Sequence, residues 1–243
     1  MFEQIGAFHL GLGHEDPIAA LERELGHTDG KNALIVLPEA FNLGRHYSSE
    51  PGIPGFERDV IIRQLSAIAL RLASAFVVGL LEPKPEGSGT SHSSAYFVSA
   101  TEVSLMCHKQ LWDGSGHYSV CPQTPDQANP IVQDDASIIA AICMDVHNSQ
   151  RFMGIAIKAS RAQKRSNFVC IPAAMSDNSW FGGGRRGSSQ DFLKRELCAN
   201  GNLILANSDH RGVGSFITGP DWQVLTCIER EQKAENHLLV AHA

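Results

Sequence analysis

The sequence predicts an α/β fold built as a single domain. Short runs rich in β-branched residues, bounded by turn residues, alternate with longer stretches in which apolar residues recur at helical spacing. The 243 residues suffice to bury most of the surface of the unfolded chain in one core, without disulfides. The chain has no short repeat, heptad pattern or low-complexity tail, so a solenoid or a coiled coil is not expected.

Two helix–strand pairs are predicted in the first third of the chain. Asp16-Pro17 is typical of a helix N-cap and first turn, and the glycines at 26 and 30 are expected to end that helix. The elements expected after it are a strand at 33–39, a helix whose apolar residues recur over 61–72, and a strand of the fully buried type at 75–81.

The rest of the chain predicts a hairpin, two more helices and several strands. A loop rich in Pro, Gly and Ser at 82–92 precedes two short runs that can pair around Ala100-Thr101. The expected strands are at 93–100, 102–109, 136–145, 167–174, 202–208, 214–220, 223–229 and 237–243. The expected helices are at 151–165 and 191–200, with a glycine-rich loop at 181–189 between the second helix and the strand before it.

The composition restricts the classes of function. Only 19% of the residues are charged and the formal net charge is -6, so non-specific binding of nucleic acid, which needs a broad cationic surface, is not expected. The amino terminus lacks a basic start followed by an apolar run, and the longest apolar stretches are too short to span a bilayer. We therefore expect a cytoplasmic protein with a small-molecule partner and no membrane partner.

The six cysteines are scattered singly and form no CxxC pair. We interpret them as reduced thiols, because the chain is not a short secreted frame that disulfides would hold together. For each of them the default role is packing as a small buried residue. They lie at positions 107, 121, 143, 170, 198 and 227.

Three polar residues stand directly beyond apolar strands. Glu39 follows LIVLP, Lys109 follows VSLMCH and Cys143 follows ASIIAAI. Ligands of open α/β sheets bind beyond the carboxyl ends of strands, where loops carry functional residues on a rigid scaffold. Taken singly, each residue has an ordinary explanation: Glu39 as a solvated loop residue, Lys109 as a side chain that extends to water, and Cys143 as a small core residue. Their combination is more informative than any one of them.

In this order the three residues resemble the signature of the nitrilase superfamily of carbon–nitrogen hydrolases. Its motifs correspond to Pro38-Glu39-Ala40-Phe41, His108-Lys109-Gln110-Leu111 and Ile142-Cys143-Met144-Asp145. Later segments also suit the family: IPAAM from 171, RELCANGNLILANS from 195 and GSFITGPDWQVL from 214. The resemblance therefore extends over nearly the whole chain.

These residue types are suited to hydrolysing an amide. A free thiol ionises near pH 8.5 and must lose its proton to act as a nucleophile, and Glu39 is a carboxylate that can accept that proton. Lys109, as an ammonium, would stabilise the Cys143 thiolate and the oxyanion, together with the backbone N–H of Met144. The predicted intermediate is a thioester at Cys143.

The resemblance implies a four-layer αββα sandwich, with residues 1–243 forming one carbon–nitrogen hydrolase domain. It further implies no metal, no organic cofactor, and assembly into a homodimer or a larger homo-oligomer. Positions that match the family's motifs, or flank them, are candidates for the substrate pocket or its support. They are Phe41, Asp113, Asp126, Asp145, His147, Ala173 and Ala174.

The chain departs from the common family pattern in three places. Many members carry a second glutamate that positions the base and the lysine, but 110–142 contains no Glu, and Asp126 is the candidate replacement. Where amidase-type members continue with Arg-Phe-Pro-Glu, this chain has residues 147–150, HNSQ, so the substrate wall or its support is altered. The common Tyr-Asn-Ser/Thr is here His92-Ser93-Ser94.

Two other chemistries are compatible with parts of the sequence. Cys143 could pair with His147 or His108 in a Cys–His hydrolase, although no third residue or oxyanion signature accompanies such a pair. A metal site could use Cys107, His108, His117 and Cys121, but this segment contains the lysine that the hydrolase mechanism needs.

The substrate is also open within the hydrolase hypothesis. Asp145, two residues after the nucleophile, favours an amide or N-carbamoyl substrate such as a ureide, whereas nitrile-cleaving members tend to have Trp-Glu after the cysteine. Arg185 and Arg186 in the glycine-rich loop could bind a substrate carboxylate. The alternatives are a nitrile-hydrolysing enzyme and a catalytically silent binding protein with the same fold.

Overall fold

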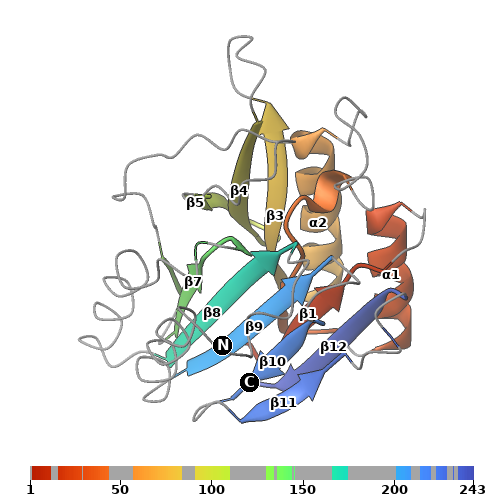
Figure 1. Cartoon of the computed structure of the whole chain (residues 1–243), viewed down its shortest axis with the longest axis vertical. Coiled ribbons are helices and arrows are strands. Elements are labelled where there is room, and N and C mark those ends of the chain that lie inside the picture. The colour runs from red at the N-terminus through yellow and green to blue at the C-terminus, as the bar shows by residue number, and fades with distance from the viewer. Residues whose placement is uncertain are drawn as a thin grey trace, which may run out of the picture.

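The computed structural model contains two β-sheets and, among the residues that it describes, two helices (Figure 1). The described residues are 2–11, 16–28, 30–43, 57–83, 91–109, 130–133, 136–143, 145, 166–174, 201–208, 214–219, 223–228, 232 and 235–243. All statements about the fold below concern these residues.

The first sheet combines strands from residues 4–108 with the last strand of the chain. Its order is β12 (His237–His242), β1 (Gln4–His9), β2 (Ala33–Val36), β3 (Ala75–Pro83), β4 (Ser91–Val98) and β5 (Val103–His108). β1, β2 and β3 are parallel, and the other neighbouring pairs are antiparallel. Consequently, the ends of β2 and β5 and the start of β4 lie at the same edge of the sheet.

The second sheet has the same arrangement, with three parallel strands flanked by antiparallel ones. Its order is β11 (Val224–Cys227), β10 (Phe216–Thr218), β9 (Gly201–Asn207), β8 (Ser166–Ala173), β7 (Ala136–Ala140) and β6 (Ile131–Gln133). β7, β8 and β9 are parallel to one another. Their carboxyl ends therefore share an edge of this sheet, as those of β2 and β3 do in the first.

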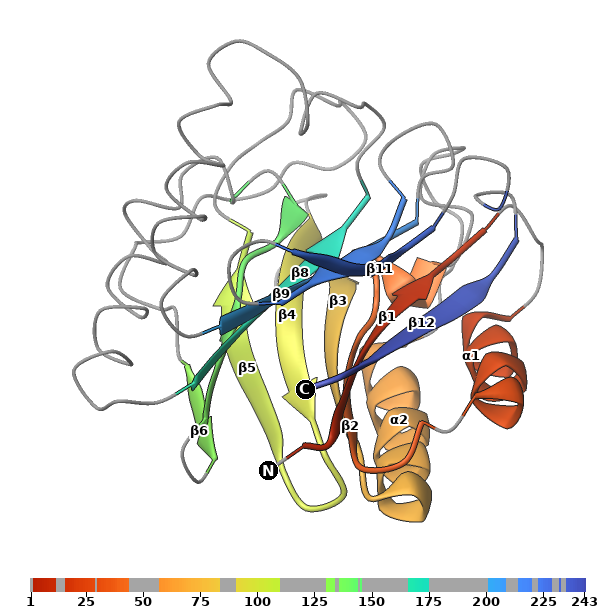
Figure 2. The same ribbon diagram turned by 90° about the horizontal axis from the view of Figure 1, so that it is seen from below.

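The sheets stack face to face, and α1 and α2 cover the outer face of the first sheet (Figure 2). Side chains from both sheets form one apolar core between them, including Leu34 and Val77 from one sheet and Val169 from the other. Ile35 points the opposite way and packs under the helices. Because β2 is buried on both faces, it is a continuous apolar run rather than an alternating one.

Both described helices begin close to the positions that the sequence predicts. In α1 (Pro17–His27), the Asp16 side chain accepts hydrogen bonds from the backbone N–H groups of Ile18 and Ala19. The expectation that Gly26 ends this helix is wrong: the helix continues to His27, and Thr28 closes it. α2 (Arg58–Leu72) ends at Ala73, which has a left-handed conformation.

The α/β class and the single domain are confirmed, with two further differences from the predicted elements. The strands expected at 33–39 and 136–145 end earlier, at Val36 and Ala140, because the chain leaves the sheet there and turns. β1 and β6 were not predicted. The helices expected at 151–165 and 191–200, and hence the second helical layer, lie outside the described residues. No described helix combines the length and the apolar character that crossing a bilayer requires.

Candidate active site

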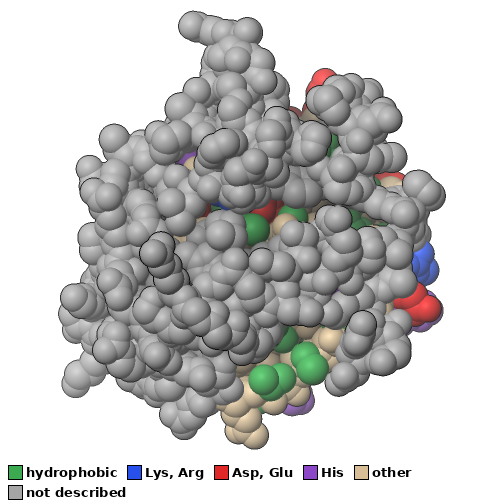
Figure 3. Space-filling model, viewed as in Figure 1, with side chains coloured by type: hydrophobic (Ala, Val, Ile, Leu, Met, Phe, Trp, Pro, Cys, Tyr) green, Lys and Arg blue, Asp and Glu red, His purple; other side chains and the backbone are tan. Residues whose placement is uncertain are grey.

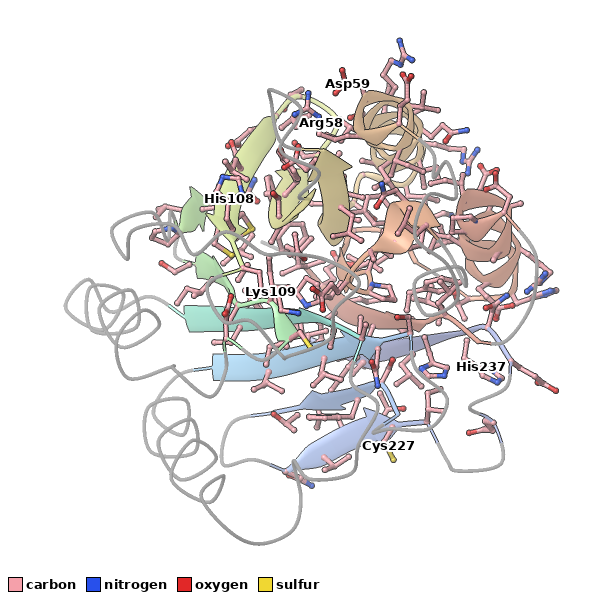
Figure 4. All side chains as sticks on the ribbon, turned by 45° about the horizontal axis from the view of Figure 1, so that its top comes forward. Arg58, Asp59, His108, Lys109, Cys227 and His237 are labelled. Atoms are coloured by element: carbon pink, nitrogen blue, oxygen red, sulfur yellow. The ribbon has the colours of Figure 1, made fainter. Side chains whose placement is uncertain are left out.

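Glu39, Lys109 and Cys143 are brought together at the edges of the two sheets. Glu39 lies just beyond β2, Lys109 directly follows β5, and Cys143 lies just beyond β7 in the facing sheet. Their exposed fractions are 1%, 2% and 3%, so all three are buried. Figure 4 shows Lys109 near the centre of the molecule, whereas Arg58 and Asp59 lie at its periphery.

Glu39 and Lys109 form a buried ion pair. The Lys109 Nζ atom donates to Glu39 Oε1 over 2.8 Å, and the Ser93 hydroxyl donates to the same oxygen over 2.8 Å. Glu39 Oε2 is buried and has no hydrogen-bond partner in the described part of the chain. Buried carboxylates normally have partners for both oxygens, and an unpaired one often marks a functional site. One oxygen of Glu39 is therefore held, and the other remains open to a ligand or a proton.

The Cys143 thiol lies in the field of this pair. Burial raises the pKa of the thiol to about 12; the positive charge of Lys109 opposes this rise and the negative charge of Glu39 adds to it. The backbone N–H of Ala174, just after β8, donates to the sulfur and also lowers the pKa. At neutral pH the resting thiol is therefore protonated, and a neighbouring base must remove its proton to make a nucleophile.

Cys143 and Ala40 both have backbone conformations that side chains disfavour. Cys143 has φ 48° and Ala40, directly after Glu39, has φ 56°. Non-glycine residues in this left-handed region cost about 1–3 kcal/mol, and such residues concentrate at functional sites. The turn at Cys143 ends with the backbone N–H of Asp145 donating to Ile142 C=O. Each of the two segments is thus held in a sharp turn directly beyond its strand.

Hydrogen bonds of the backbone and of the Asn42 side chain attach the Glu39 segment to both sheets. The Glu39 N–H donates to the C=O of Ala173 at the end of β8, which also accepts the N–H of Ser208. The side chain of Asn42 bonds both backbone groups of Leu81 on β3, its Nδ2 donating to the C=O and its Oδ1 accepting from the N–H. These contacts fix the loop that presents Glu39.

Gly79 on β3 allows this loop to lie close to the sheet. A Cβ atom at Gly79 would lie 2.7 Å from Glu39 Cα, 2.9 Å from Pro172 Cβ and 3.0 Å from Pro38 O. Two of these atoms belong to the Glu39 segment, so any side chain at position 79 would displace the glutamate backbone. A glycine within a strand often marks such a close approach.

The other candidates that the structure describes have supporting positions. Phe41 is fully buried and packs edge-to-face on Phe8, with ring centroids 6.1 Å apart, so it anchors the loop in the core under the helices. Asp145 is buried, and its charge adds to the effect of burial in raising the pKa of Cys107. Six candidates lie outside the described residues: Asp113, Asp126, Met144, His147, Arg185 and Arg186.

Two residues considered for a Cys–His pair or a metal site, His108 and Cys107, make contacts of another kind. The Ser94 hydroxyl pairs with His108 Nδ1 at 2.8 Å, and the Cys107 thiol is directed to Ala140 C=O at 3.6 Å. Among the described residues, no group of three or more His, Cys, Asp or Glu side chains could hold a metal ion. His117, Cys121 and His147 lie outside the described residues.

Sequence reasoning did not identify Ser93, Asn42 or Gly79 as parts of the site. For Gly79 a signal exists, because a glycine interrupts the apolar run FVVGLL. Ser93 appears in the sequence only as a departure from a motif, and its contact with Glu39 follows from the register that places Ser93 beside Leu81. Asn42 has no sequence signal of its own.

The arrangement can support acid–base and nucleophilic chemistry together. A protonated thiol, a carboxylate with one open oxygen and a fixed ammonium lie within one buried site. Removal of water strengthens the interaction of such charges with a reacting group. On the face drawn in Figure 3, acidic, basic and hydrophobic side chains are visible together in one small area near the centre.

Comparison with known proteins adds a fold assignment. No family model matches the sequence, and a search of curated proteins finds no match. A crystal structure of an amidase from Nesterenkonia sp. is 19% identical, with a TM-score of 0.68 over 99% of this chain and 89% of that chain. A double variant of the amidase from Nesterenkonia sp. AN1, in complex with acrylamide, is 18% identical, with a TM-score of 0.68 over 100% of this chain and 90% of that chain.

A cysteine-to-alanine variant of Nesterenkonia AN1 amidase, described as from the nitrilase superfamily, gives a TM-score of 0.67 at 18% identity. That match covers 99% of this chain and 90% of the other. At these identities the similarity establishes the fold, and it extends over nearly the whole length of both proteins. This chain therefore has the fold of the nitrilase-superfamily amidases.

Proposed function

We propose that this protein is an amidase-type carbon–nitrogen hydrolase that cleaves a small amide through a thioester at Cys143. The observation that carries the proposal is the buried Glu39–Lys109 ion pair beside a buried, protonated thiol. An ion pair excluded from water is expensive to maintain and is weak evidence for stability, which favours a chemical role. The proposal treats residues 1–243 as one catalytic domain.

The structural neighbours support an amide as the substrate class. One variant of the Nesterenkonia amidase is in complex with acrylamide and another with butyramide. A glutamate-to-glutamine variant of that enzyme shows covalent addition of the acetamide moiety of fluoroacetamide at the active site cysteine. By analogy, we expect a short-chain primary amide to enter the site between the two sheets.

Acylation would begin with proton transfer from the Cys143 thiol to Glu39. The sulfur then attacks the amide carbon, and the carbonyl π electrons move to the oxygen to give a tetrahedral oxyanion. Lys109 and the backbone N–H of Met144 would stabilise this charge. When the oxyanion collapses, the C–N bond breaks and the nitrogen takes the proton from Glu39, so ammonia leaves and the acyl group remains on sulfur.

Deacylation would reuse the same groups with water in place of the thiol. Glu39, ionised again, removes a proton from water as the oxygen attacks the thioester carbon. The C–S bond then breaks, and the sulfur regains a proton from Glu39. The products are a carboxylic acid and the free enzyme, so the reaction balances with one amide and one water molecule. The absence of a metal or an organic cofactor stays a prediction.

Other substrates and a silent binding protein remain the alternatives to test. A ureide or N-carbamoyl compound would follow the same steps, and a nitrile would form a thioimidate at Cys143 before water adds. A silent binding protein has no chemical need for a buried base, ammonium and thiol in contact. The homo-oligomeric state and the cytoplasmic location also stay predictions.

The experiment is an ammonia-release assay on a panel of amides, ureides and nitriles. We expect the wild type to release ammonia from at least one short amide and Cys143→Ala to release none above background. Cys170→Ala is the matched control, because Cys170 is also a buried thiol but lies in the core of the second sheet. It should retain most of the activity of the wild type.

Undiminished release by Cys143→Ala would contradict the mechanism. Fluoroacetamide gives a second readout that does not depend on turnover. It should label buried Cys143, which the site activates, in preference to the exposed thiol of Cys227. If the wild type hydrolyses nothing on the panel and Cys143 is not labelled, the silent binding protein replaces the enzyme.

Gly79→Ala should lower both stability and activity. The added methyl group must displace the Glu39 backbone or Pro172, and overpacking of this kind costs about 1–3 kcal/mol. A displacement of the base by about 1 Å would reduce turnover about a hundredfold. Urea unfolding and the ammonia assay measure the two effects separately.

Gly26→Ala is the matched control, since Gly26 lies in α1 and has no atom within 4 Å of an added Cβ. It should stabilise the fold by about 0.5–1 kcal/mol and leave turnover unchanged. If Gly79→Ala behaves like Gly26→Ala, the close approach at Gly79 does not position the base.

A further inference from the structure

Ser93 contacts both members of the buried ion pair. Its side-chain hydroxyl donates to Glu39 Oε1 over 2.8 Å, and its backbone C=O accepts the backbone N–H of Lys109 over 2.7 Å. Ser93 is itself 1% exposed, so water does not compete for these contacts. It lies on β4, which pairs with β3 on one side and β5 on the other. A single residue thus connects the Glu39 carboxylate to the backbone that carries Lys109.

The contacts of Ser93 make the two oxygens of Glu39 unequal. Oε1 accepts from both the Ser93 hydroxyl and Lys109 Nζ, whereas Oε2 has no partner among the described residues. A carboxylate oxygen whose lone pairs are both engaged by donors cannot take a further proton without losing one of them. A proton arriving at Glu39 is therefore directed to Oε2.

We propose that Ser93 is a positioning residue for the hydrolysis, which holds Glu39 Oε1 so that Oε2 receives the proton of Cys143. This inference rests on the proposed function and extends it to a residue outside the predicted Glu39–Lys109–Cys143 set. The hydroxyl has two effects: it fixes the rotation of the carboxylate, and it stabilises its ionised form by donating to it. Both effects keep the base in the state that can accept a proton.

Ser93 also occupies a position where the sequence departs from the common family pattern. Residues 110–142 contain no glutamate that could hold the base and the lysine together, and Ser93 stands in the segment that replaces Tyr-Asn-Ser/Thr. The contacts of Ser93 join the base to the lysine from β4 instead. Part of the positioning role of the missing glutamate is thus assigned to a neutral hydroxyl.

The test is the pH dependence of kcat/KM in Ser93→Ala, with Ser94→Ala as the matched control. Ser94 is the next residue on β4, is fully buried, and donates to or accepts from His108 rather than Glu39. For Ser93→Ala we expect kcat/KM to fall on the order of tenfold and the acid limb of the profile to move up by about one pH unit. Ser94→Ala should leave the acid limb in place, and Ser93→Thr, which keeps the hydroxyl, should stay close to the wild type.

A general loss of packing would lower the rate at every pH without moving the acid limb. An unmoved limb in Ser93→Ala, or an equal movement in Ser94→Ala, would overturn the inference while amide hydrolysis by the wild type stands. If the wild type hydrolyses no substrate, the proposed function fails, and the inference, which rests on it, fails with it.

Discussion

Lys109→Met is expected to destabilise the fold by about 3–5 kcal/mol and to abolish turnover. The substitution removes the ammonium and leaves the Glu39 carboxylate buried, with the Ser93 hydroxyl still donating to Oε1. Removing one member of a buried ion pair costs this much free energy of unfolding, because the remaining charge is left buried without an opposite charge beside it. Urea unfolding measures the loss of stability.

Two further variants distinguish the effect of the buried charge on stability from the general effect of replacing a long cationic side chain with methionine. Arg71→Met removes the cation of an exposed pair with Glu22, at 2.9 Å, and should cost no more than about 1 kcal/mol. The double variant Glu39→Gln/Lys109→Met removes both buried charges, so it should regain much of the lost stability and none of the activity. A Lys109→Met variant as stable as the wild type would contradict the conclusion that Glu39 and Lys109 form a buried ion pair.

Glu39→Gln is expected to reduce turnover by about a hundredfold to ten-thousandfold while the fold persists. Glutamine keeps an oxygen that can accept from Lys109 and Ser93, but it cannot take a proton from the thiol or from water. The negative charge at Glu39 adds to the effect of burial on Cys143, so its removal should bring the pKa of the thiol below about 12. Lys109 still favours the thiolate.

Labelling of Cys143 by fluoroacetamide as a function of pH measures this second effect. In Glu39→Gln the labelling should persist, and the ionisation of the thiol should occur at lower pH than in the wild type. Glu82→Gln is the matched control, because Glu82 near the end of β3 pairs with Arg58 and Tyr96 and not with Lys109 or Ser93. It should retain turnover. Turnover by Glu39→Gln at the rate of the wild type would exclude Glu39 as the base.

The fold class and the neighbourhood of the site were predictable because they depend on local patterns. An apolar strand followed by one polar residue predicts where that residue lies in a sheet, and this holds for Glu39, Lys109 and Cys143. Their order along the chain, compared with a known family, then predicts that the two sheets face each other. The stacked sheets agree with this prediction.

The details that organise the site were not predictable, because they depend on contacts between distant strands. Ser93 reaches Glu39 only through the pairing of β4 with β3, and Gly79 matters only because Pro38 and Pro172 approach it from two different sheets. The apolar run predicts a strand that continues to 145, but β7 ends at Ala140, and the positive φ of Cys143 belongs to the turn beyond it. The periodicity of apolar residues predicts which face of a strand is buried, but it predicts neither the pairing register of the strand nor the position of a turn.

During turnover, Cys143 is expected to carry the acyl group of the amide. Acid-quenched wild-type protein, taken while it hydrolyses a short amide, should show the added mass of the acyl group on the peptide that contains Cys143. We expect that adduct, its absence from Cys143→Ala, and the loss of ammonia release in the same variant. An acyl group on any other side chain, or ammonia released by Cys143→Ala at the rate of the wild type, would contradict it.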